Sequence, residues 1–259
     1  MRGNGLSSAS ITNSLETRFI GQRVIYYPRL ASTMDTARQR AQQGAAEGTV
    51  IIADKQTAGK GRINRVWSSP KGSITLSIIL YPTLFHLPAL IMLASLAVVH
   101  SIEAVTGLEV QIKWPNDVLI NGKKVCGILI ESDARGDVVA YAIIGIGINA
   151  NFRLADFPEI TSLATSLADE LGMDVSRVNV IRWLLAEMER LYLVVSDGET
   201  IYEEWRDRLV TLGRKVRVEA GETIFEGVAE SVARDGSLLL RRLDGSLSKI
   251  VAGDTTLRD

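Results

Sequence analysis

Short apolar runs in the first half of the chain alternate with polar segments that contain glycine or charged residues. Runs of this length, bounded in this way, are typical of β-strands, and they occur at residues 24–27, 49–54, 74–80 and 109–114. Between the first two, residues 32–44 predict a helix, because Ser32 can cap its start and Gly44 can end it.

A longer apolar segment, residues 87–102, is still too short to span a membrane and contains His100. Pro88 suits a first helical turn and Gly107 suits a helix end, so the segment predicts a buried helix. The only other histidine is His86, and two histidines cannot build a histidine-rich metal site.

The clearest turn in the chain is Asn121-Gly122, which stands between two apolar runs. Asn-Gly is the preferred two-residue hairpin turn, and a second turn at residues 133–137 leads into the apolar run 138–151. Consecutive strands that are joined by tight turns pair in an antiparallel manner. Together with the helices, this predicts an α+β fold in which a mixed or antiparallel sheet packs against helices.

The pattern of apolar and polar residues changes in the last third of the chain. Apolar side chains recur at helical spacing over residues 178–195, and residues 199–213 predict another helix. After these, short strand-like segments are punctuated by Gly and Asp, which predicts a small β-barrel. We therefore expect a flexible polar lead at 1–20, a main domain at 21–212 and a barrel domain at 213–259.

Composition and charge narrow the possible partners and the cellular compartment. The 259 residues carry 29 Lys and Arg against 30 Asp and Glu, a net charge of −1, so no overall basic field attracts nucleic acid or an anionic membrane. Cys126 is the single cysteine, which excludes a disulfide within the chain and fits a reducing cytoplasm. The first twenty residues lack the apolar core of a signal peptide.

The first candidate site is the segment 56–72, which places Gly59, Gly61 and four cations between two predicted strands. Backbone freedom beside cations suits an anionic phosphate or carboxylate. A phosphate loop of the strand–GxxxxGK[ST]–helix kind is excluded, because Asp54 stands where its first glycine should be and no helix begins here. The alternative is a solvated basic connection.

Two further stretches carry polar groups at strand ends. In KWPNDVLINGKKVCGILIE, residues 113–131, Asp117 could accept a ribose hydroxyl or hold a metal ion, and Lys124 could return its ammonium to the same end. The alternative is an ordinary turn aspartate and an exposed lysine. In IGIGINAN, residues 144–151, two glycines within a strand indicate close approach by another group, or a tight strand crossing, and Asn149 offers a donor and an acceptor.

In their order and spacing, these stretches resemble the biotin protein ligases, also called biotin–[acetyl-CoA-carboxylase] ligases, from about residue 16 to the C-terminus. The matching features are the loop GKGRINR, KWPND, the following K-x-x-G-I-L-x-E and G-I-N. The resemblance implies a class II synthetase-like core with an SH3-like C-terminal barrel. It also implies that biotin and ATP give biotinyl-5′-AMP and pyrophosphate, and that the adenylate then acylates one lysine of a biotin carboxyl carrier protein.

The resemblance implies roles for particular residues. The residues implied to bind biotin are Ser32, Thr33, Met34, Gln56, Lys60, Gly61, Arg62 and Lys124. The residues implied to be catalytic, around the biotin carboxylate and the α-phosphate, are Arg62, Arg65 and Lys124. The residues implied to contact ATP or the adenylate are Trp67, Ser68, Asp117, Asn149 and Arg258, with Asp117 also implied to bind Mg²⁺.

The chain departs from the family's pattern in the loop, where G-R-G-R-x-G-R reads GKGRINR. Lys60 replaces an arginine and Asn64 replaces a glycine, and asparagine tolerates a positive φ well enough for the turn to survive. About twenty residues precede the strand at 24, too few for the DNA-binding domain of bifunctional members, so we expect no DNA partner. A homodimer is compatible with the resemblance. The rival functions are a lipoate or octanoate ligase or transferase of the same fold, and a non-catalytic biotin-binding module.

Overall fold

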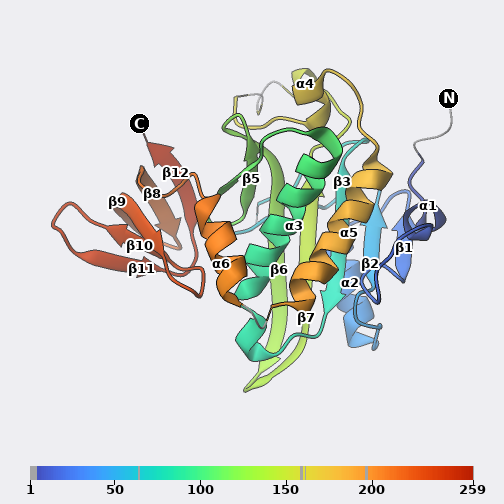
Figure 1. The fold of residues 1–259 in the computed structure, drawn as a ribbon, viewed down its shortest axis with the longest axis horizontal. Helices are drawn as coiled ribbons and strands as arrows, with labels where there is room; N and C mark the ends of the chain where they lie inside the picture. Colours follow the sequence, from blue (N-terminus) through green and yellow to red (C-terminus); the bar gives the residue numbers. More distant parts are fainter. Residues whose placement is uncertain (1–4, 64, 158–159, 161, 196–197, 259) are drawn as a thin grey trace.

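A seven-stranded sheet forms the centre of the molecule (Figure 1). The structure is a computed structural model that describes residues 5–63, 65–157, 160, 162–195 and 198–258. The strands of this sheet are β1 (Val24–Tyr27), β2 (Val50–Ala53), β3 (Ile74–Leu80), β4 (Gln111–Lys113), β5 (Asp117–Ile120), β6 (Lys123–Arg135) and β7 (Val138–Ile148). They pair in the order β1-β2-β3-β7-β6-β5-β4.

The sheet is mixed. Strand β1 pairs with β2 in parallel, and the other neighbouring pairs are antiparallel. A parallel pair needs a crossover, and helix α2 (Thr33–Gln42) lies between these two strands in the sequence. Asn121 (φ 50°) and Gly122 (φ 75°) form the turn between β5 and β6, with the two positive φ values of a type I′ hairpin turn. The predicted hairpin and the predicted α+β class are both confirmed.

Helices cover both faces of the sheet. Helices α3 (Ala89–Thr106) and α5 (Arg177–Leu193) lie together over one face, where they join the main hydrophobic core (Figure 1). On the other face, α2 buries Met34, Ala37 and Ala41 in a smaller apolar cluster. Helix α3 is long and apolar enough to cross a membrane by length and composition alone. Because it is mostly buried in this core, it is the predicted core helix.

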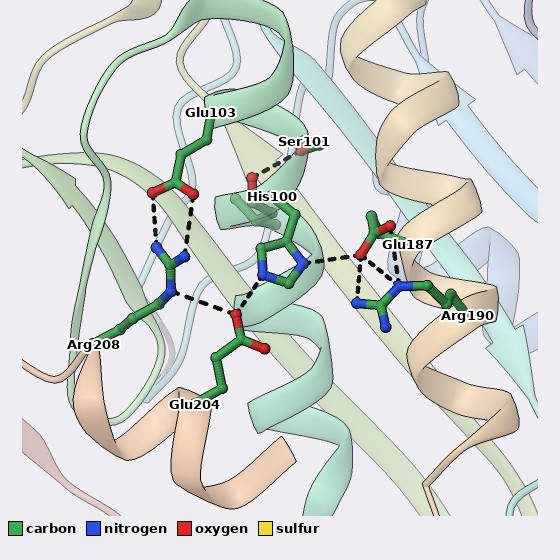
Figure 2. A network of polar contacts seen from close by, with 8 residues as sticks. His100, Ser101, Glu103, Glu187, Arg190, Glu204 and Arg208 are labelled. Atoms are coloured by element: carbon green, nitrogen blue, oxygen red, sulfur yellow. Dashed lines mark hydrogen bonds and ion pairs between the residues drawn. The ribbon is translucent and has the colours of Figure 1, made fainter. Parts of the chain in front are cut away.

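Helix α6 (Gly198–Asp207) completes the helical layer and is tied to it by polar contacts (Figure 2). His100 of α3 lies between two carboxylates, 2.9 Å from Glu187 of α5 and 2.6 Å from Glu204 of α6. Arg190 contacts Glu187, and Arg208 contacts Glu204 and Glu103 (Figure 2). His100 is therefore the satisfied helix histidine that the sequence predicts.

The first described residues are not a flexible lead, contrary to the prediction for 1–20. Residues 8–12 form helix α1 (Ser8–Thr12), which packs on α5 and buries Ile11. The carboxylate of Glu189 accepts hydrogen bonds from the backbone N–H groups of Arg18, Phe19 and Ile20. A few apolar side chains of this polar segment are buried in the core. The composition of the segment alone does not indicate this.

The C-terminal part forms a second, five-stranded antiparallel sheet, called here the C-terminal sheet. Its strands are β8 (Lys215–Ala220), β9 (Thr223–Val232), β10 (Leu238–Arg241), β11 (Leu247–Ile250) and β12 (Asp254–Arg258). They pair in the order β11-β10-β9-β8-β12. The fully buried Trp114 fastens this sheet to the core, because its indole N–H donates to the Gly236 carbonyl at 2.8 Å.

The remaining elements are short and lie in connections. They are helix α4 (Leu167–Leu171) and the 3-10 helices η1 (Leu84–His86) and η2 (Leu154–Asp156). Helix α4 follows the end of β7 and is joined to it by backbone hydrogen bonds, from Leu167 to the Asn149 carbonyl and from Ala168 to the Ala150 carbonyl. These bonds fix the end of the strand that runs along the candidate site.

Candidate active site

One cavity collects side chains from α2, from β3, β5, β6 and β7, and from the C-terminal sheet. It lies under residues 59–67, called here the cation loop because they carry Lys60, Arg62 and Arg65. The loop is paired with itself: the Trp67 N–H donates to the Gly59 carbonyl at 2.9 Å, and the Gly61 N–H donates to the Arg65 carbonyl at 2.8 Å. This pairing turns the loop back so that Trp67 enters the cavity.

Glycines make the room that the cavity needs. A Cβ at Gly147 would lie 2.4 Å from the Trp67 ring, and one at Gly145 would lie 2.5 Å from the Met34 sulfur. Gly127 is the partner of Gly147 on the neighbouring strand and also faces Trp67. The close approach that the sequence predicts for IGIGINAN is thus confirmed, and the approaching groups are two side chains of this chain.

Polar groups line the end of the cavity near α2. The Gln56 side-chain oxygen accepts hydrogen bonds from Thr33, at 2.7 Å from its backbone N–H and at 3.0 Å from its hydroxyl. The Ser77 hydroxyl donates to the Thr33 hydroxyl at 2.9 Å. Together with the apolar Met34, these groups form a small half-polar pocket whose walls are already fixed by hydrogen bonds.

Arg62 and Arg65 connect the cation loop to the rest of the site. Arg62 donates to the Asn116 side-chain oxygen at 2.8 Å and to the Gly253 carbonyl at 3.3 Å, and Arg65 pairs with Asp254. Burial lowers the pKa of Arg62, against the opposing effect of the negative charges of Asp254 and Asp117. A guanidinium that is partly desolvated and faces a cavity interacts strongly with an anion placed there.

Lys124 is a further cation at the cavity, beside Lys60, Arg62 and Arg65. Its ammonium lies 2.6 Å from the Asp117 carboxylate, and Lys113 lies 3.8 Å from the same carboxylate. The Lys124 ammonium also lies 5.6 Å from the centre of the Trp67 ring, within the range of a cation–π contact. The indole N–H of Trp67 is buried and has no hydrogen-bond partner among the described residues.

The structure thus brings most of the predicted residues to one cavity. Those that line it are Thr33, Met34, Gln56, Lys60, Gly61, Arg62, Arg65, Trp67, Asp117 and Lys124. Asn64 lies outside the described residues. The neighbouring Ile63 has a positive φ of 50°.

Four predicted residues do not line this cavity. Ser32 is buried and caps α2 through a 3.5 Å contact with the Asp35 N–H, and Ser68 is exposed. Asn149 is buried and donates to the Thr165 carbonyl at 2.9 Å. Arg258 pairs with Glu226 at 3.0 Å on the C-terminal sheet. Ser32, Asn149 and Arg258 contact protein groups in this structure, and the predicted ligand contacts of all four residues stay predictions.

The donor set does not form a metal site built from protein alone. Among the described residues there is no group of three or more His, Cys, Asp and Glu side chains that could hold a metal ion. The carboxylate of Asp117 already pairs with Lys124. Mg²⁺ is commonly held by one or two carboxylates together with substrate phosphates, and Asp117 alone meets only the first part of that requirement.

Three residues at the site were not identified from the sequence. Asn116 positions Arg62, Asp254 pairs with Arg65, and Asp35 pairs with Lys60 at 2.5 Å. Asn116 stands inside KWPND and Asp254 inside the terminal GDTTLR, so motif position was a usable signal for both. Asp35 is marked in the sequence only by its place three residues after the Ser32 cap, and its proximity to Lys60 depends on how α2 and the cation loop pack.

Two family models match the chain. The biotin/lipoate A/B protein ligase family matches residues 26–149, and the biotin protein ligase C-terminal domain matches residues 211–258. The first match runs from within β1 past the end of β7 and contains nearly every cavity residue named above. The second covers the C-terminal sheet and includes Asp254.

Individual proteins show the same similarity. The bifunctional ligase/repressor BirA of Bacillus subtilis is 42% identical over 258 residues, which cover 97% of this chain and 79% of that protein. The biotin–[acetyl-CoA-carboxylase] ligase of Mycobacterium tuberculosis is 35% identical over 83% of this chain and 81% of its own length. The structure of biotin protein ligase from Aquifex aeolicus with biotin and ATP superposes with a TM-score of 0.77 at 28% identity, covering 92% and 99% of the two chains. This chain belongs to the biotin protein ligase family.

Proposed function

We propose that the protein is an ATP-dependent ligase that activates biotin as biotinyl-5′-AMP and transfers it to a lysine of a biotin carboxyl carrier protein. The observation that carries the proposal is the composition of one cavity. It holds a half-polar pocket at Thr33 and Gln56, four cations and the Trp67 ring. This arrangement suits a ligand with a polar ring at one end, a carboxylate in the middle and a nucleotide beyond it.

The first half-reaction explains the presence of Arg62, Arg65 and Lys124 at the cavity. In it, an oxygen of the biotin carboxylate attacks the α-phosphorus of ATP, a carboxyl–phosphate bond forms, and pyrophosphate leaves with the electrons of the broken P–O bond. Two anions must approach each other, so fixed positive charges lower the barrier. Arg62, Arg65 and Lys124 are the cations around the cavity that would supply them.

The present partners of these cations also fit the proposal. Asp117 and Asp254 neutralise Lys124 and Arg65 in the described structure. Biotin carboxylate and phosphate oxygens would offer the same cations a second set of anionic partners. The Trp67 N–H, which is buried without a partner among the described residues, offers a donor to a ligand at the same place.

The second half-reaction needs a dry cavity and a neutral amine. The mixed anhydride would hydrolyse in open water, and a loop that covers it excludes water. The carrier lysine must attack as a free amine although its ordinary pKa is about 10.4. It replaces AMP on the biotin carbonyl and gives up a proton, and Asp117 is the carboxylate at the cavity that we nominate to accept it.

The same geometry assigns different roles to the two parts of the chain. We assign the biotin and ATP cavity to residues 21–212 and a covering role to residues 213–259, which reach the cavity through Asp254. Mg²⁺ would enter with the ATP phosphates beside Asp117, and no step of the proposal depends on it. A cytoplasmic location fits the single cysteine, Cys126, which is buried. A homodimer and the absence of a DNA partner remain predictions.

The rival reading as a lipoate or octanoate ligase is less well supported. The family model over residues 26–149 includes lipoate ligases, but the model over residues 211–258 is specific to biotin protein ligases. A non-catalytic biotin-binding module would not need Arg62, Arg65 and Lys124 together beside the half-polar pocket.

Transfer to a carrier tests the proposal. The protein is mixed with ATP, Mg²⁺, biotin and a biotin carboxyl carrier domain, and the intact mass of the domain is measured over time. We expect the mass to rise by one biotinyl group, and a carrier whose acceptor lysine is replaced by arginine should remain unmodified. No mass increase under conditions where a known ligase modifies the same carrier would overturn the proposal.

A further inference from the structure

We propose that Asp35 is a positioning residue that holds the cation loop over the cavity through its ion pair with Lys60. The inference rests on the proposed function for its consequence in catalysis, but the loop contact itself can be tested without any reaction. It concerns a feature of this chain, because Lys60 stands where the family's loop carries an arginine and Asp35 lies outside the stretches that carry the family resemblance.

The ion pair is part of a chain of charges across three elements. The Lys60 ammonium lies 2.5 Å from an Asp35 carboxylate oxygen, and the same oxygen lies 2.7 Å from Arg38. Arg38 pairs in turn with Glu131 of β6. The cation loop is thereby connected to the first turn of α2 and, through α2, to the central sheet beside the cavity.

The contact between Asp35 and Lys60 restrains one end of the cation loop. Met34, directly before Asp35, lines the cavity, and Lys60 follows Gly59, whose carbonyl accepts the Trp67 N–H. On the far side, Arg62 and Arg65 anchor the loop to Asn116 and to residues 253–254. The far anchors use the groups that a bound carboxylate and phosphate would recruit, whereas the Asp35 contact does not.

The Asp35 carboxylate is set up to remain charged. Burial raises its pKa, but the hydrogen bonds from Lys60 and Arg38 and their positive charges outweigh burial, so the pKa of Asp35 is lowered. Its place in the first turn of α2 adds a favourable interaction with the helix dipole. At neutral pH the Asp35 carboxylate is therefore charged, and its ion pair with Lys60 can hold the loop both before ligands bind and while Arg62 and Arg65 exchange partners.

Hydrogen exchange tests the contact directly. The test variants are Asp35→Ala, Lys60→Met and the double variant. The control is Asp133→Ala, which removes the ion pair between Asp133 and Arg135 at 3.4 Å on β6, the strand that also carries Glu131. Partly exposed ion pairs are weak, so we expect exchange over residues 59–67 to rise by roughly three- to five-fold in both single variants. The double variant should exchange no faster than the single variants, because all three lack the same pair, and Asp133→Ala should match the wild type.

Two results would overturn the inference. The first is an exchange rate over residues 59–67 in Asp35→Ala equal to that of the wild type. The second is an additive effect in the double variant, which would mean that Asp35 and Lys60 act separately. The thermal midpoints of the variants are measured alongside, so that a general loss of stability is not mistaken for loop opening.

The catalytic consequence is read from the retention of the adenylate. With biotin and ATP but without carrier, we expect Asp35→Ala to release AMP several-fold faster in steady state than the wild type, because a looser loop admits water to the anhydride. Its single-turnover rate of adenylate formation should stay within about two-fold. Unchanged AMP release despite faster loop exchange would contradict the catalytic role of the pair. If the wild type forms no adenylate, the proposed function fails while the exchange result still decides the loop contact.

Discussion

The Lys124 ammonium lies 2.6 Å from the Asp117 carboxylate at the mouth of the β5–β6 hairpin. The two residues are seven positions apart, and the Asn121-Gly122 turn places Lys124 opposite Leu119, two residues along β5 from Asp117. A bulge between Val118 and Leu119 shifts the register so that Asp117 pairs with Gly127. The missing side chain at Gly127 leaves room for Lys124 and Trp67, so the hairpin places a cation, a carboxylate and an aromatic ring together.

Lys124 should therefore be needed for adenylation. Lys124→Ala should reduce biotin-dependent pyrophosphate release by roughly 10²–10³, the effect of losing one electrostatic stabiliser of the transition state. The matched control is Lys123→Ala, since Lys123 is the adjacent lysine and is exposed. Near wild-type adenylation in the Lys124 variant would exclude the role that we assign to it.

Gly147 should be needed for the placement of Trp67. In Gly147→Ala the new Cβ would meet the rigid indole at 2.4 Å, whereas in Gly145→Ala it would meet the flexible end of Met34. Overpacking of this kind typically costs about 1–3 kcal/mol, and the ring must give way. Calorimetry should show weaker ATP binding in Gly147→Ala and a smaller effect in Gly145→Ala. Equal ATP affinity in the wild type and Gly147→Ala would show that Trp67 does not shape the nucleotide site.

His100 should make stability depend on pH. The hydrogen bond to Glu187 raises the pKa of His100 above 6.5, against burial and with help from Glu204, and Glu187 itself has a pKa lowered to about 2. The contribution of His100 to the free energy of unfolding is complete below pH 6.5 and is lost as pH rises through the raised pKa. The glutamate contribution is complete above pH 4.5 and is lost as pH falls towards 2.

Both contributions are therefore present between about pH 4.5 and 6.5. His100→Gln should reduce the free energy of unfolding by about 1.5–3 kcal/mol at pH 5.5, the usual value of hydrogen bonds to charged groups, and by less at pH 9. Denaturant titrations at the two pH values measure this, with His86→Gln as the control. A loss that is equal at both pH values would show that the charge of His100 does not matter.

The C-terminal sheet should not be removable without damage to the core. Deletion of residues 213–259 would uncover Trp114, which is fully buried, and would remove the Gly236 carbonyl that accepts its indole N–H. We expect the truncated chain to aggregate in size-exclusion chromatography. A monodisperse truncated protein with native helix content would contradict this, and its activity could then be measured directly.

Local patterns were sufficient to predict most of the elements. The apolar runs, the Asn121-Gly122 turn and the helical period of α5 each depend on neighbours along the chain, and the structure has them where the sequence places them. Residues 5–20, the described part of the polar lead, were mispredicted because their order depends on Glu189, which is far away in sequence. Residues 1–4 lie outside the described residues. In the barrel, the sequence predicts strands at 215–220, 222–233, 237–243 and 246–252. The fifth strand, β12, is missing from this prediction, because its pairing with β8 is a tertiary contact.

The candidate site was predictable only in part, for a related reason. Motifs identify which residues gather, but the direction of a side chain depends on register and packing. Asn149 turns its amide to the Thr165 carbonyl and Arg258 turns to Glu226, while Asn116 and Asp254 reach the two loop arginines. Such partners are separated by up to 191 positions, as for Arg62 and Gly253, and no local pattern encodes them.

The most direct test of the central claim is pyrophosphate release from ATP with biotin, lipoate and octanoate in parallel. We predict release with biotin alone, at a rate that falls roughly 10²–10³-fold in Lys124→Ala. Release with lipoate or octanoate and none with biotin would assign the cavity to another acid. Biotin binding without release in the presence of ATP and Mg²⁺ would show a binding module and contradict the account.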